Sequence, residues 1–279
     1  MALNSINYNA SAIAALSNLN STSQGLTISQ NRISTGQAIS VPGDNSAIWA
    51  IAQRTRADSS ALDAVIQSLQ RNQSVNDTAT AAATQVADLL NQIKAKVVSA
   101  SDTSIDAASR TALNTDVNSL ILQINRTVSN ASFNGANLIK SGATALAALA
   151  DSAGGKLTIS AQILSVKVGG VNTNITFSAG ASFTTATTAN SLLTLVNTSI
   201  TNVTAAIAKL GTNSNALATH VKFVQSLQDQ LNNGVSNLVD ADVAKESATL
   251  QALQTRQQLG VQALQIANAS KGALLSLFR

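Results

Sequence analysis

The most regular pattern in this chain is a heptad repeat of apolar and small residues in its N-terminal half. The repeat runs through Ile48, Ile51, Thr55, Asp58, Leu62, Val65, Leu69, Asn72, Asn76, Ala79, Ala83, Val86, Leu90, Ile93 and Val97. Residues at this spacing form one stripe along a helix, and the stripe needs partner helices to cover it. At about 1.5 Å per residue, such a helix is roughly 75 Å long. Pro42 and Gly43 predict a turn before it, with Asp44 as its N-cap.

Two later segments carry the same spacing. The first predicts a shorter helix that ends at Asn134-Gly135, and its apolar positions are Leu113, Val117, Leu120, Ile124 and Val128. The second is another long stripe, at Leu193, Val196, Ile200, Val203, Ile207, Leu210, Ser214, Leu217, Val221, Val224, Gln228, Leu231, Val235 and Leu238. Because both long stripes need cover, each is the natural partner of the other.

The two ends of the chain repeat this pattern more weakly. Their apolar positions include Leu19, Leu26 and Ile33 at one end and Leu250, Leu253 and Leu264 at the other. Polar residues interrupt both stripes, so neither helix is stable alone. Residues 1–31 and 257–270 also carry no charged side chain. We therefore expect these ends to become ordered only when they pack against each other and against neighbouring copies.

The middle of the chain changes to a period of two. Leu157, Ile159 and Ile163 precede a Gly169-Gly170 pair, and Val171, Ile175 and Phe177 follow it. Alternation around two glycines predicts a β-hairpin with a Gly-Gly turn. The expected fold is therefore mainly α, a long helical coiled-coil or bundle rod formed by the N- and C-terminal segments, with a small central β-hairpin insert.

The amino-acid composition narrows the range of possible functions. Charged residues make up 11% of the chain, against roughly a quarter in an ordinary soluble domain. The basic residues are scattered rather than interleaved with aromatic ones, which argues against a nucleic-acid partner. The longest apolar stretch near the N-terminus covers only residues 12–16, and no basic segment precedes it. We therefore expect neither a cleaved signal peptide nor membrane insertion.

The sequence offers little for catalysis. His220 is the single histidine and there is no cysteine, so a histidine cluster, a zinc site or a Cys–His nucleophile cannot be assembled within one chain. No G-x-S-x-G serine or phosphate-binding glycine motif occurs. We expect no enzyme activity, no cofactor and no metal. Asn72, Asn76 and Ser214 leave two interpretations open, because polar heptad residues either fix register or lie in a loosely packed seam.

Several segments at both ends resemble bacterial flagellin. They are the opening Met1-Ala2-Leu3-Asn4-Ser5-Ile6-Asn7, the run Asn31-Arg32-Ile33-Ser34-Thr35-Gly36, DNSAIWAIAQR over 44–54, Phe133-Asn134-Gly135, NLVDADVAKESATL from Asn237, and the final LLSLFR. The resemblance covers roughly residues 1–140 and 190–279 and leaves the insert unmatched.

This resemblance implies a structural subunit that is exported and polymerises into the extracellular flagellar filament for swimming. It implies an inner terminal-helix domain of residues 1–40 and 240–279, a helical rod domain of 41–140 and 190–239, and an exposed insert of 141–189. The implied partners are further copies of the chain or other flagellins, the type III export apparatus, an export chaperone, the filament cap and hook-associated proteins.

Two other functions are weighed against this one. A hook-filament junction protein shares flagellin-like ends, and copy number along the filament separates it from a filament subunit. A secreted enzyme with its catalytic site in the insert is disfavoured, because the insert has no histidine and its one acidic residue is Asp151.

Two sets of residues are expected to carry the function. The residues expected to pack between subunits are Leu16, Leu19, Leu26, Ile33, Leu250, Leu253 and Leu264. The resemblance also implies O-glycosylation in or beside the insert, with candidate sites at Thr173, Thr176, Ser182, Thr184, Thr185, Thr187 and Thr188.

Overall fold

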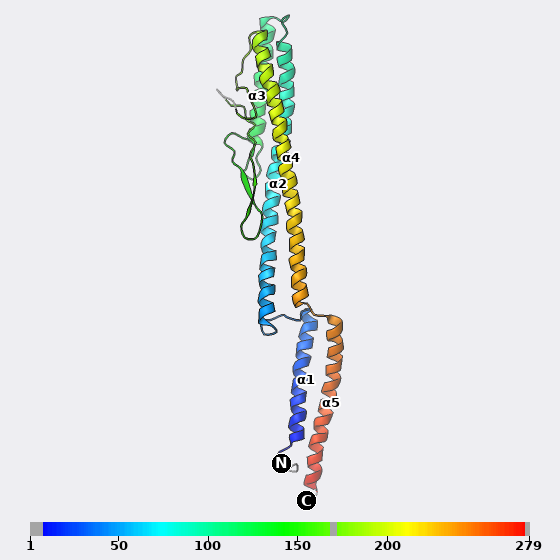
Figure 1. Ribbon diagram of the computed structural model, residues 1–279. Coiled ribbons are helices and arrows are strands. Elements are labelled where there is room, and N and C mark those ends of the chain that lie inside the picture. The colour runs from blue at the N-terminus through cyan, green and yellow to red at the C-terminus, as the bar shows by residue number, and fades with distance from the viewer. Residues whose placement is uncertain (1–7, 168–171, 277–279) are drawn as a thin grey trace. The chain divides into compact units, whose positions relative to one another are not determined.

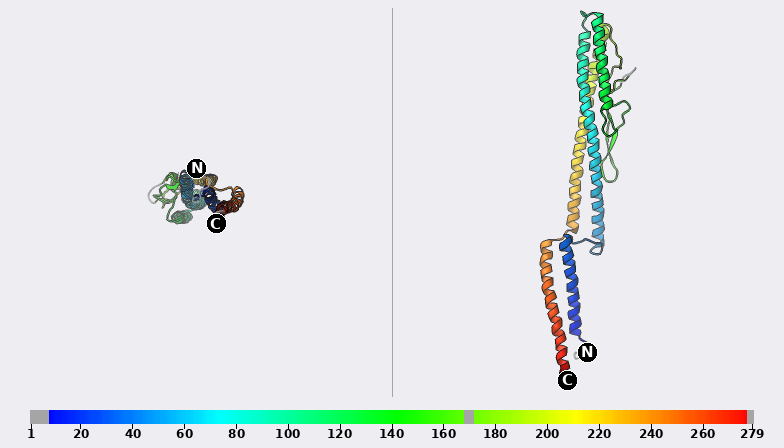
Figure 2. Two further views of the ribbon diagram at one scale, coloured as in Figure 1. Left: turned by 90° about the horizontal axis from the view of Figure 1, so that it is seen from below. Right: turned by 180° about the vertical axis from the view of Figure 1, so that it is seen from behind.

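The computed structural model describes residues 8–167 and 172–276. Its helices are α1 (Ala10–Thr35), α2 (Ser46–Ala100), α3 (Ala107–Asn130), α4 (Ala186–Val239) and α5 (Val243–Ser276), and its strands are β1 (Leu146–Leu149) and β2 (Lys156–Ile159) (Figures 1 and 2). The chain forms two compact units. The first comprises Met1–Ala57 and Gln230–Arg279, and the second is Asp58–Asp229. The mainly helical fold with a small two-stranded sheet confirms the predicted fold class.

The first unit is built around the antiparallel helices α1 and α5. The side chain of Asn9 accepts a hydrogen bond from the Ala12 amide and caps the start of α1. Gly36 ends α1 in the left-handed conformation, with φ 71°, where a glycine has no Cβ penalty. The Ala241 amide then donates to the Gly36 carbonyl at 2.8 Å, which joins the segment after α1 to the segment before α5.

A small apolar core completes this unit beside the two connecting segments. It consists of Ala52 from the first turns of α2 and Val235 and Val239 from the end of α4, with Ile39 packed against them. The Ala38 amide donates to the Val239 carbonyl at 2.7 Å. Trp49, the single tryptophan of the chain, is half-buried on α2 one turn before Ala52.

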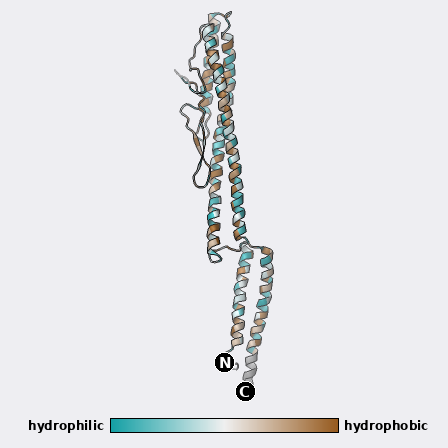
Figure 3. Cartoon of the chain, in the orientation of Figure 1, coloured by the Kyte–Doolittle hydropathy of each residue, from teal (hydrophilic) through white to brown (hydrophobic). Residues whose placement is uncertain are grey.

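The second unit packs α3 and the longer parts of α2 and α4 around one core. Figure 3 shows apolar residues recurring along these helices between polar ones. The predicted stripe of α2 is buried from Leu62 to Val97, apart from the half-exposed Asn72. The predicted positions of α4 are buried at Val196, Val203, Leu210, Leu217 and Val224. Both long stripes therefore lie where the heptad spacing placed them over most of this unit.

The stripes depart from the predicted positions near the start of α2 and the end of α4. Ile51 is 55% exposed and Asp58 is exposed, whereas the next residues, Ala52 and Ser59, are buried. Leu238 is likewise exposed and Val239 buried. A straight helix drifts about 20° per heptad relative to a strict seven-residue repeat. Over several heptads this drift moves the predicted position off the interface and brings its neighbour in.

The start of α2 also differs from the prediction. The Ile48 amide donates to Asn45 Oδ1 at 3.1 Å, so Asn45 and not Asp44 caps the helix. Asp44 Oδ2 instead accepts the backbone amides of Ser40 at 2.9 Å and Val41 at 3.1 Å, and closes the preceding turn. These two bonds lower the pKa of Asp44, because they stabilise its charged form.

A buried arginine joins α2 to α3. Arg110 Nε donates to the carbonyl of Ala100, the last residue of α2, at 3.0 Å. Its Nη2 donates to the carbonyls of Asp102 at 2.9 Å and Ile105 at 3.4 Å. The side chain thus satisfies carbonyls that a helix end and its loop leave unpaired.

Helix α3 ends at Asn130, four residues before the predicted stop. Asn134 and Gly135, with φ 49° and 79°, form a separate turn in which Phe133 pairs with Ala136. The end of the helix is held by Asn137, whose Nδ2 donates to the Val128 carbonyl at 2.7 Å. The Asn134–Gly135 turn therefore reverses the chain after the helix rather than ending the helix itself.

The hairpin of the insert lies earlier in the chain than predicted. Strand β2 contains Leu157 and Ile159, as expected, but it pairs with β1, with Leu149 opposite Lys156. Residues 160–167 and 172–177 contain no strand, and Gly169-Gly170 lies outside the described residues. Backbone donors of this segment bond other parts of the chain instead: the Gln162 and Leu164 amides donate to the Leu138 and Ile139 carbonyls, the Val166 amide to Asn125 Oδ1 and the Thr176 amide to Ser199 Oγ. The alternating apolar residues are therefore buried as irregular chain.

Candidate functional site: the paired terminal helices

Helices α1 and α5 bury little surface in one chain. In α1, Leu26 and Ser29 are the buried residues, and the described part of α5 has none. The sequence explains this, because each helix has one narrow apolar stripe broken by polar residues. A helix pair of this kind gains little from apolar burial, at about 25 cal/mol per Å².

Two glycines let the helices approach closely. A Cβ on Gly25 would lie 3.4 Å from Leu253 Cδ1, and a Cβ on Gly260 would lie 3.3 Å from Leu19 Cδ1. Each helix therefore receives a leucine of its partner beside a glycine. These contacts place Leu19 and Leu253, two of the predicted packing residues, at the centre of the pair.

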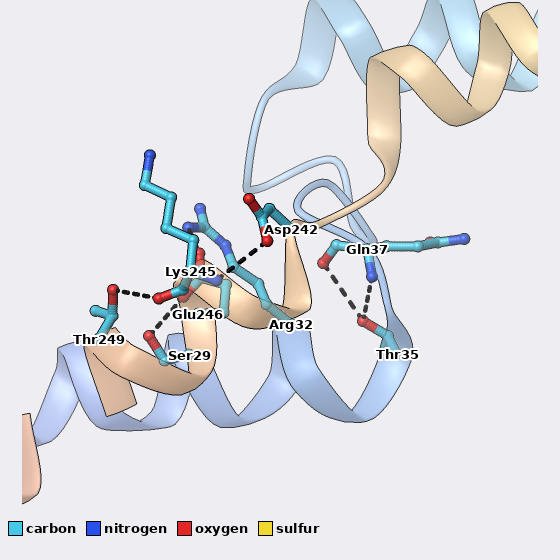
Figure 4. Close-up of polar contacts among 8 residues, drawn as sticks. All are labelled: Ser29, Arg32, Thr35, Gln37, Asp242, Lys245, Glu246 and Thr249. Atoms are coloured by element: carbon cyan, nitrogen blue, oxygen red, sulfur yellow. Dashed lines mark hydrogen bonds and ion pairs between the residues drawn. The ribbon is translucent and has the colours of Figure 1, made fainter. Parts of the chain in front are cut away.

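A polar cluster holds the pair together where α1 ends and α5 begins, as Figure 4 shows. Ser29 Oγ donates to Glu246 Oε2 at 2.8 Å, and Arg32 Nη1 donates to Glu246 Oε1 at 3.0 Å. The Ser29 hydroxyl, and then the Arg32 guanidinium, lower the pKa of Glu246 by stabilising its carboxylate. Asp242 caps α5, since its Oδ1 accepts the Lys245 amide at 3.1 Å. These contacts fix the register of the two helices.

The other predicted packing residues of α1 and α5 are buried to different degrees. Leu26 is buried, and Ile33, Leu250 and Leu264 are half-buried. Leu16 is 47% exposed. The structure therefore places most of this set between the two helices of one chain and leaves Leu16 at the surface.

A second set of apolar residues on these helices is exposed and was not among the predicted packing residues. Its members are Ile13 and Ile28 on α1 and Leu259, Val261 and Ile266 on α5, of which Ile266 is 70% exposed. Leu259 and Ile266 are seven residues apart, so they share a face of α5. This spacing was the signal that could have revealed a second stripe. Exposed apolar rows of this kind indicate a surface that another protein covers.

Charged residues are few on α1 and α5: they are Arg32 on α1 and Lys245, Glu246, Arg256 and Lys271 on α5. In α1 the one charged residue is Arg32, and its partner is Glu246. Neutral faces can pack side by side in many copies without like-charge repulsion. The arrangement suits contact with further helices of the same kind.

The remaining candidate residues have structural contacts. His220 lies on α4, where its Nε2 is 2.7 Å from the Ala150 carbonyl and its ring stacks near Phe223. No group of three or more His, Cys, Asp or Glu residues in the described part of the chain could hold a metal ion. Asn76 is buried and its Nδ2 donates to the Leu210 carbonyl across the α2–α4 seam at 3.0 Å. Asn72 bonds within its own helix, and Ser214 donates to Asp77.

Helix α4 is long and apolar enough to cross a membrane, and 28% of its most apolar stretch is buried. Its buried apolar positions face α2 and α3, and Thr, Ser and Asn residues occupy the other faces. We interpret it as a core helix of the bundle.

The candidate glycosylation residues fall into two groups. Thr173, Ser182, Thr184 and Thr187 are exposed. Thr176 is half-buried and its Oγ1 donates to the Leu195 carbonyl at 2.9 Å. Thr185 and Thr188 cap the start of α4 by exchanging backbone and hydroxyl bonds of 3.1–3.2 Å. The hydroxyls of the second group are therefore already engaged.

Comparison with known proteins shows where this architecture belongs. The bacterial flagellin N-terminal helical region matches residues 6–144, and the bacterial flagellin C-terminal helical region matches residues 193–278. The chain is 50% identical over 279 residues to Flagellin FljM of Caulobacter vibrioides, which covers 100% of both chains. It is 37% identical to a flagellin of Brucella melitensis, covering 99% of each. A crystal structure of Bacillus cereus flagellin matches 55% of this chain and 86% of that one, with 19% identity and a TM-score of 0.47.

Long helices packed in a bundle, together with a pair of terminal helices that bury little surface within one chain, are typical of a structural, self-assembling class of protein. The chain belongs to the bacterial flagellin family, whose members are structural filament proteins and not enzymes.

Proposed function

We propose that this chain is a structural subunit that polymerises through its α1–α5 pair into the bacterial flagellar filament for swimming. The observation that carries the proposal is the terminal pair, which buries little within one chain and exposes further apolar residues on each helix. The full-length similarity to chains named flagellin favours a filament subunit over a hook-filament junction protein.

The small apolar surface that α1 and α5 bury within one chain explains how assembly is driven. Ordering the backbone costs about 1–2 kcal/mol per residue, and a narrow stripe offsets little of that cost. In the free chain the two ends are therefore largely disordered. Neighbouring copies cover the exposed rows, so that ordering of the ends and polymerisation occur together, through head-to-tail contacts that do not close into a ring.

Limited proteolysis tests this mechanism. Protease should trim both ends of the free chain and leave a soluble core that does not polymerise, whereas the ends should resist in filaments. A Leu259→Gln, Ile266→Gln variant should also lose polymerisation, and a Val98→Gln variant, exposed to 49% on α2, is the matched control. A trimmed core that still forms normal filaments contradicts the proposal.

The filament that flagellins form is extracellular. We propose that this chain reaches it through a type III export apparatus, with an export chaperone, a filament cap and hook-associated proteins as partners, and without removal of a signal peptide. Support comes from α1, which begins at Ala10 and forms half of the terminal pair. Loss of that segment would remove Leu19 and its contact with Gly260. N-terminal peptide mapping of sheared filaments distinguishes export without removal of a signal peptide from export with its removal.

We further propose a division of roles in the filament. Residues 1–40 and 240–279 form an inner tube, residues 41–140 and 190–239 a rod layer, and residues 141–189 an outer insert. Any O-linked glycan then belongs on the insert side. The exposed Thr173, Ser182, Thr184 and Thr187 are better acceptors than Thr176, Thr185 and Thr188, whose hydroxyls are bonded.

A further inference from the structure

The turn that follows α3 places an asparagine directly before a glycine. Asn134 and Gly135 are its central residues, with φ 49° and 79°, and both are exposed. The flanking Phe133 and Ala136 close the turn by backbone hydrogen bonds of 2.9 and 3.0 Å. Asparagine and glycine adopt positive φ at lower cost than other residues, so the pair suits this turn.

An asparagine followed by glycine is also the residue pair most prone to lose the side-chain amide. The backbone nitrogen of the glycine gives up its proton to solvent base and attacks the side-chain carbonyl carbon. A carbon–nitrogen bond forms, and the side-chain nitrogen takes up a proton and leaves as ammonia. Water then opens the succinimide ring to give aspartate or isoaspartate. Glycine favours the attack because it has no Cβ beside the nitrogen and its backbone rotates most freely.

The backbone nitrogen of Gly135 is placed for this attack. The bonds that close the turn use the amides of Phe133 and Ala136, and Gly135 donates to no acceptor in the described part of the chain. Apart from its neighbours in sequence, no atom lies within 4 Å of the position that a Cβ on Gly135 would occupy. Neither a hydrogen bond nor a packed side chain therefore has to give way before the ring closes.

The chain contains a second Asn-Gly pair in a different backbone setting. Asn233 is exposed, as Asn134 is, but Asn233 and Gly234 lie inside α4, which ends at Val239. An amide in an α-helix donates to the carbonyl four residues earlier, so the Gly234 nitrogen is engaged. Ring closure at Asn233 therefore requires local opening of the helix, which ring closure at Asn134 does not.

The product at position 134 would carry a negative charge close to a cation. Arg71 of α2 and Asn134 line the same hollow, which has a volume of about 150 Å³. Arg71 is exposed and takes part in neither of the ion pairs among the described residues. A carboxylate at position 134 gives this arginine a partner of opposite charge, and the exposure of both groups keeps the gain in stability small.

We propose that Asn134 is a site of spontaneous deamidation, which converts it through a succinimide to a carboxylate beside Arg71. The reaction needs only water and solvent base, and it does not depend on the proposed filament function. Aspartate keeps the turn, because its side chain also tolerates positive φ. Isoaspartate lengthens the backbone by a methylene group and so disturbs the pairing of Phe133 with Ala136.

Peptide mapping tests the site. The full chain is incubated in mildly alkaline buffer and digested with trypsin, and a sample digested at the start corrects for conversion during digestion. Asn134 lies in the tryptic peptide of residues 127–140 and Asn233 in that of residues 223–245. Asn134 should convert about tenfold faster than Asn233 or more, because only the helical site must first open. In concentrated urea the two rates should become similar.

Equal rates at the two asparagines in the folded chain overturn the inference. Isoelectric focusing gives a second readout, since each conversion adds a negative charge. Asn134→Gln should suppress the acidic form that accumulates in the wild-type chain, and the matched control Asn233→Gln should leave it unchanged. An acidic form that accumulates equally in Asn134→Gln also overturns the inference.

The pairing with Arg71 has its own test. In the Asn134→Asp variant, nuclear magnetic resonance measures the pKa of the side-chain carboxyl at position 134. Adding Arg71→Gln should raise that pKa, because the carboxylate loses its cation. Adding Arg126→Gln, at an exposed position of α3, is the matched control and should change it less. A pKa that Arg71→Gln leaves unchanged overturns the pairing.

Discussion

Arg110 shows at the residue scale how one side chain can organise the end of a helix. Its three backbone acceptors belong to the end of α2 and the loop that follows, and the side chain is 7% exposed. Removing a buried donor leaves these carbonyls unpaired, which costs far more than losing a bond at the surface. This role could not be predicted, since no local pattern in the sequence distinguishes Arg110 from the exposed arginines.

Arg110→Ala should therefore lower the free energy of unfolding of the second unit by about 2–4 kcal/mol. Arg126→Ala, at an exposed position of the same helix, is the matched control and should change it by less than about 0.5 kcal/mol. Urea unfolding of the two monomers gives the comparison. Equal midpoints for the two variants would show that Arg110 is not structural.

Glu246 makes the terminal pair sensitive to acid. Its folded-state pKa is lowered from 4.5 by the Ser29 and Arg32 bonds, so its contribution to stability is present above about 4.5 and is lost as pH falls through the folded pKa. Asp44, Asp102 and Asp106 have lowered pKa values as well and act in the same direction.

Filaments of Glu246→Gln should consequently lose less thermal stability than wild-type filaments when the pH is lowered below about 4.5. At neutral pH the variant should be the less stable of the two, because Arg32 loses its carboxylate partner. Melting curves over this pH range measure the difference. If both proteins show parallel pH profiles, Glu246 does not couple acid to the helix pair.

At the element scale, the glycines of the terminal helices balance helix formation against close packing. A glycine in a helix costs about 1 kcal/mol relative to alanine. The Cβ of an alanine at position 25 would lie 3.4 Å from Leu253, an ordinary contact, whereas at position 260 it would lie 3.3 Å from Leu19, so that the leucine must shift slightly.

Gly25→Ala is therefore expected to slow protease trimming of the free chain, because α1 becomes intrinsically more helical. Gly25→Leu should instead weaken the packing of α1 against α5, since the larger side chain separates the two helices. It should therefore weaken polymerisation. Timed digestion and sedimentation of each variant measure both effects. Faster trimming of Gly25→Ala than of wild type would refute this account.

The long helices α2 and α4 show what the sequence could predict. Heptad spacing located the long helices and most of the seam from Leu62 to Val97, because burial along a continuous helix repeats with its turn. It placed Ile51 and Leu238 in the seam wrongly, since helical drift accumulates over many turns. The strand partner of the hairpin could not be predicted, because the amides of Gln162, Leu164 and Val166 bond groups distant in sequence, namely the Leu138 and Ile139 carbonyls and Asn125 Oδ1.

The candidate site was predictable in part for a similar reason. A single stripe identified Leu19 and Leu253, which meet glycines of the partner helix. The second stripe, at Leu259 and Ile266, is exposed, whereas Leu19 and Leu253 of the first stripe contact the partner helix. Which apolar residues face a neighbour depends on pairing between helices that are more than 200 residues apart, as Asn9 and Ala267 are.

At the scale of the whole molecule, the polar surface of the insert carries the proposed modification. Native filaments should contain chains heavier than the unmodified 28.5 kDa, with any O-linked group among Thr173, Ser182, Thr184 and Thr187. Intact-mass spectrometry of sheared filaments, followed by peptide mapping, measures this. The engaged Thr185 and Thr188 serve as internal controls, and a mass equal to the unmodified chain would count against glycosylation.

The half-buried Trp49 has a practical consequence for studying assembly. Tyr8 is the single tyrosine and Trp49 the single tryptophan, so nearly all ultraviolet-excited emission of this chain comes from Trp49. Trp49 lies on α2, one turn before Ala52 of the small core of the first unit. The wavelength of indole emission depends on the polarity of its surroundings. The intrinsic fluorescence of the unlabelled protein is therefore a local gauge of that turn, readable in real time while monomers add to a growing polymer.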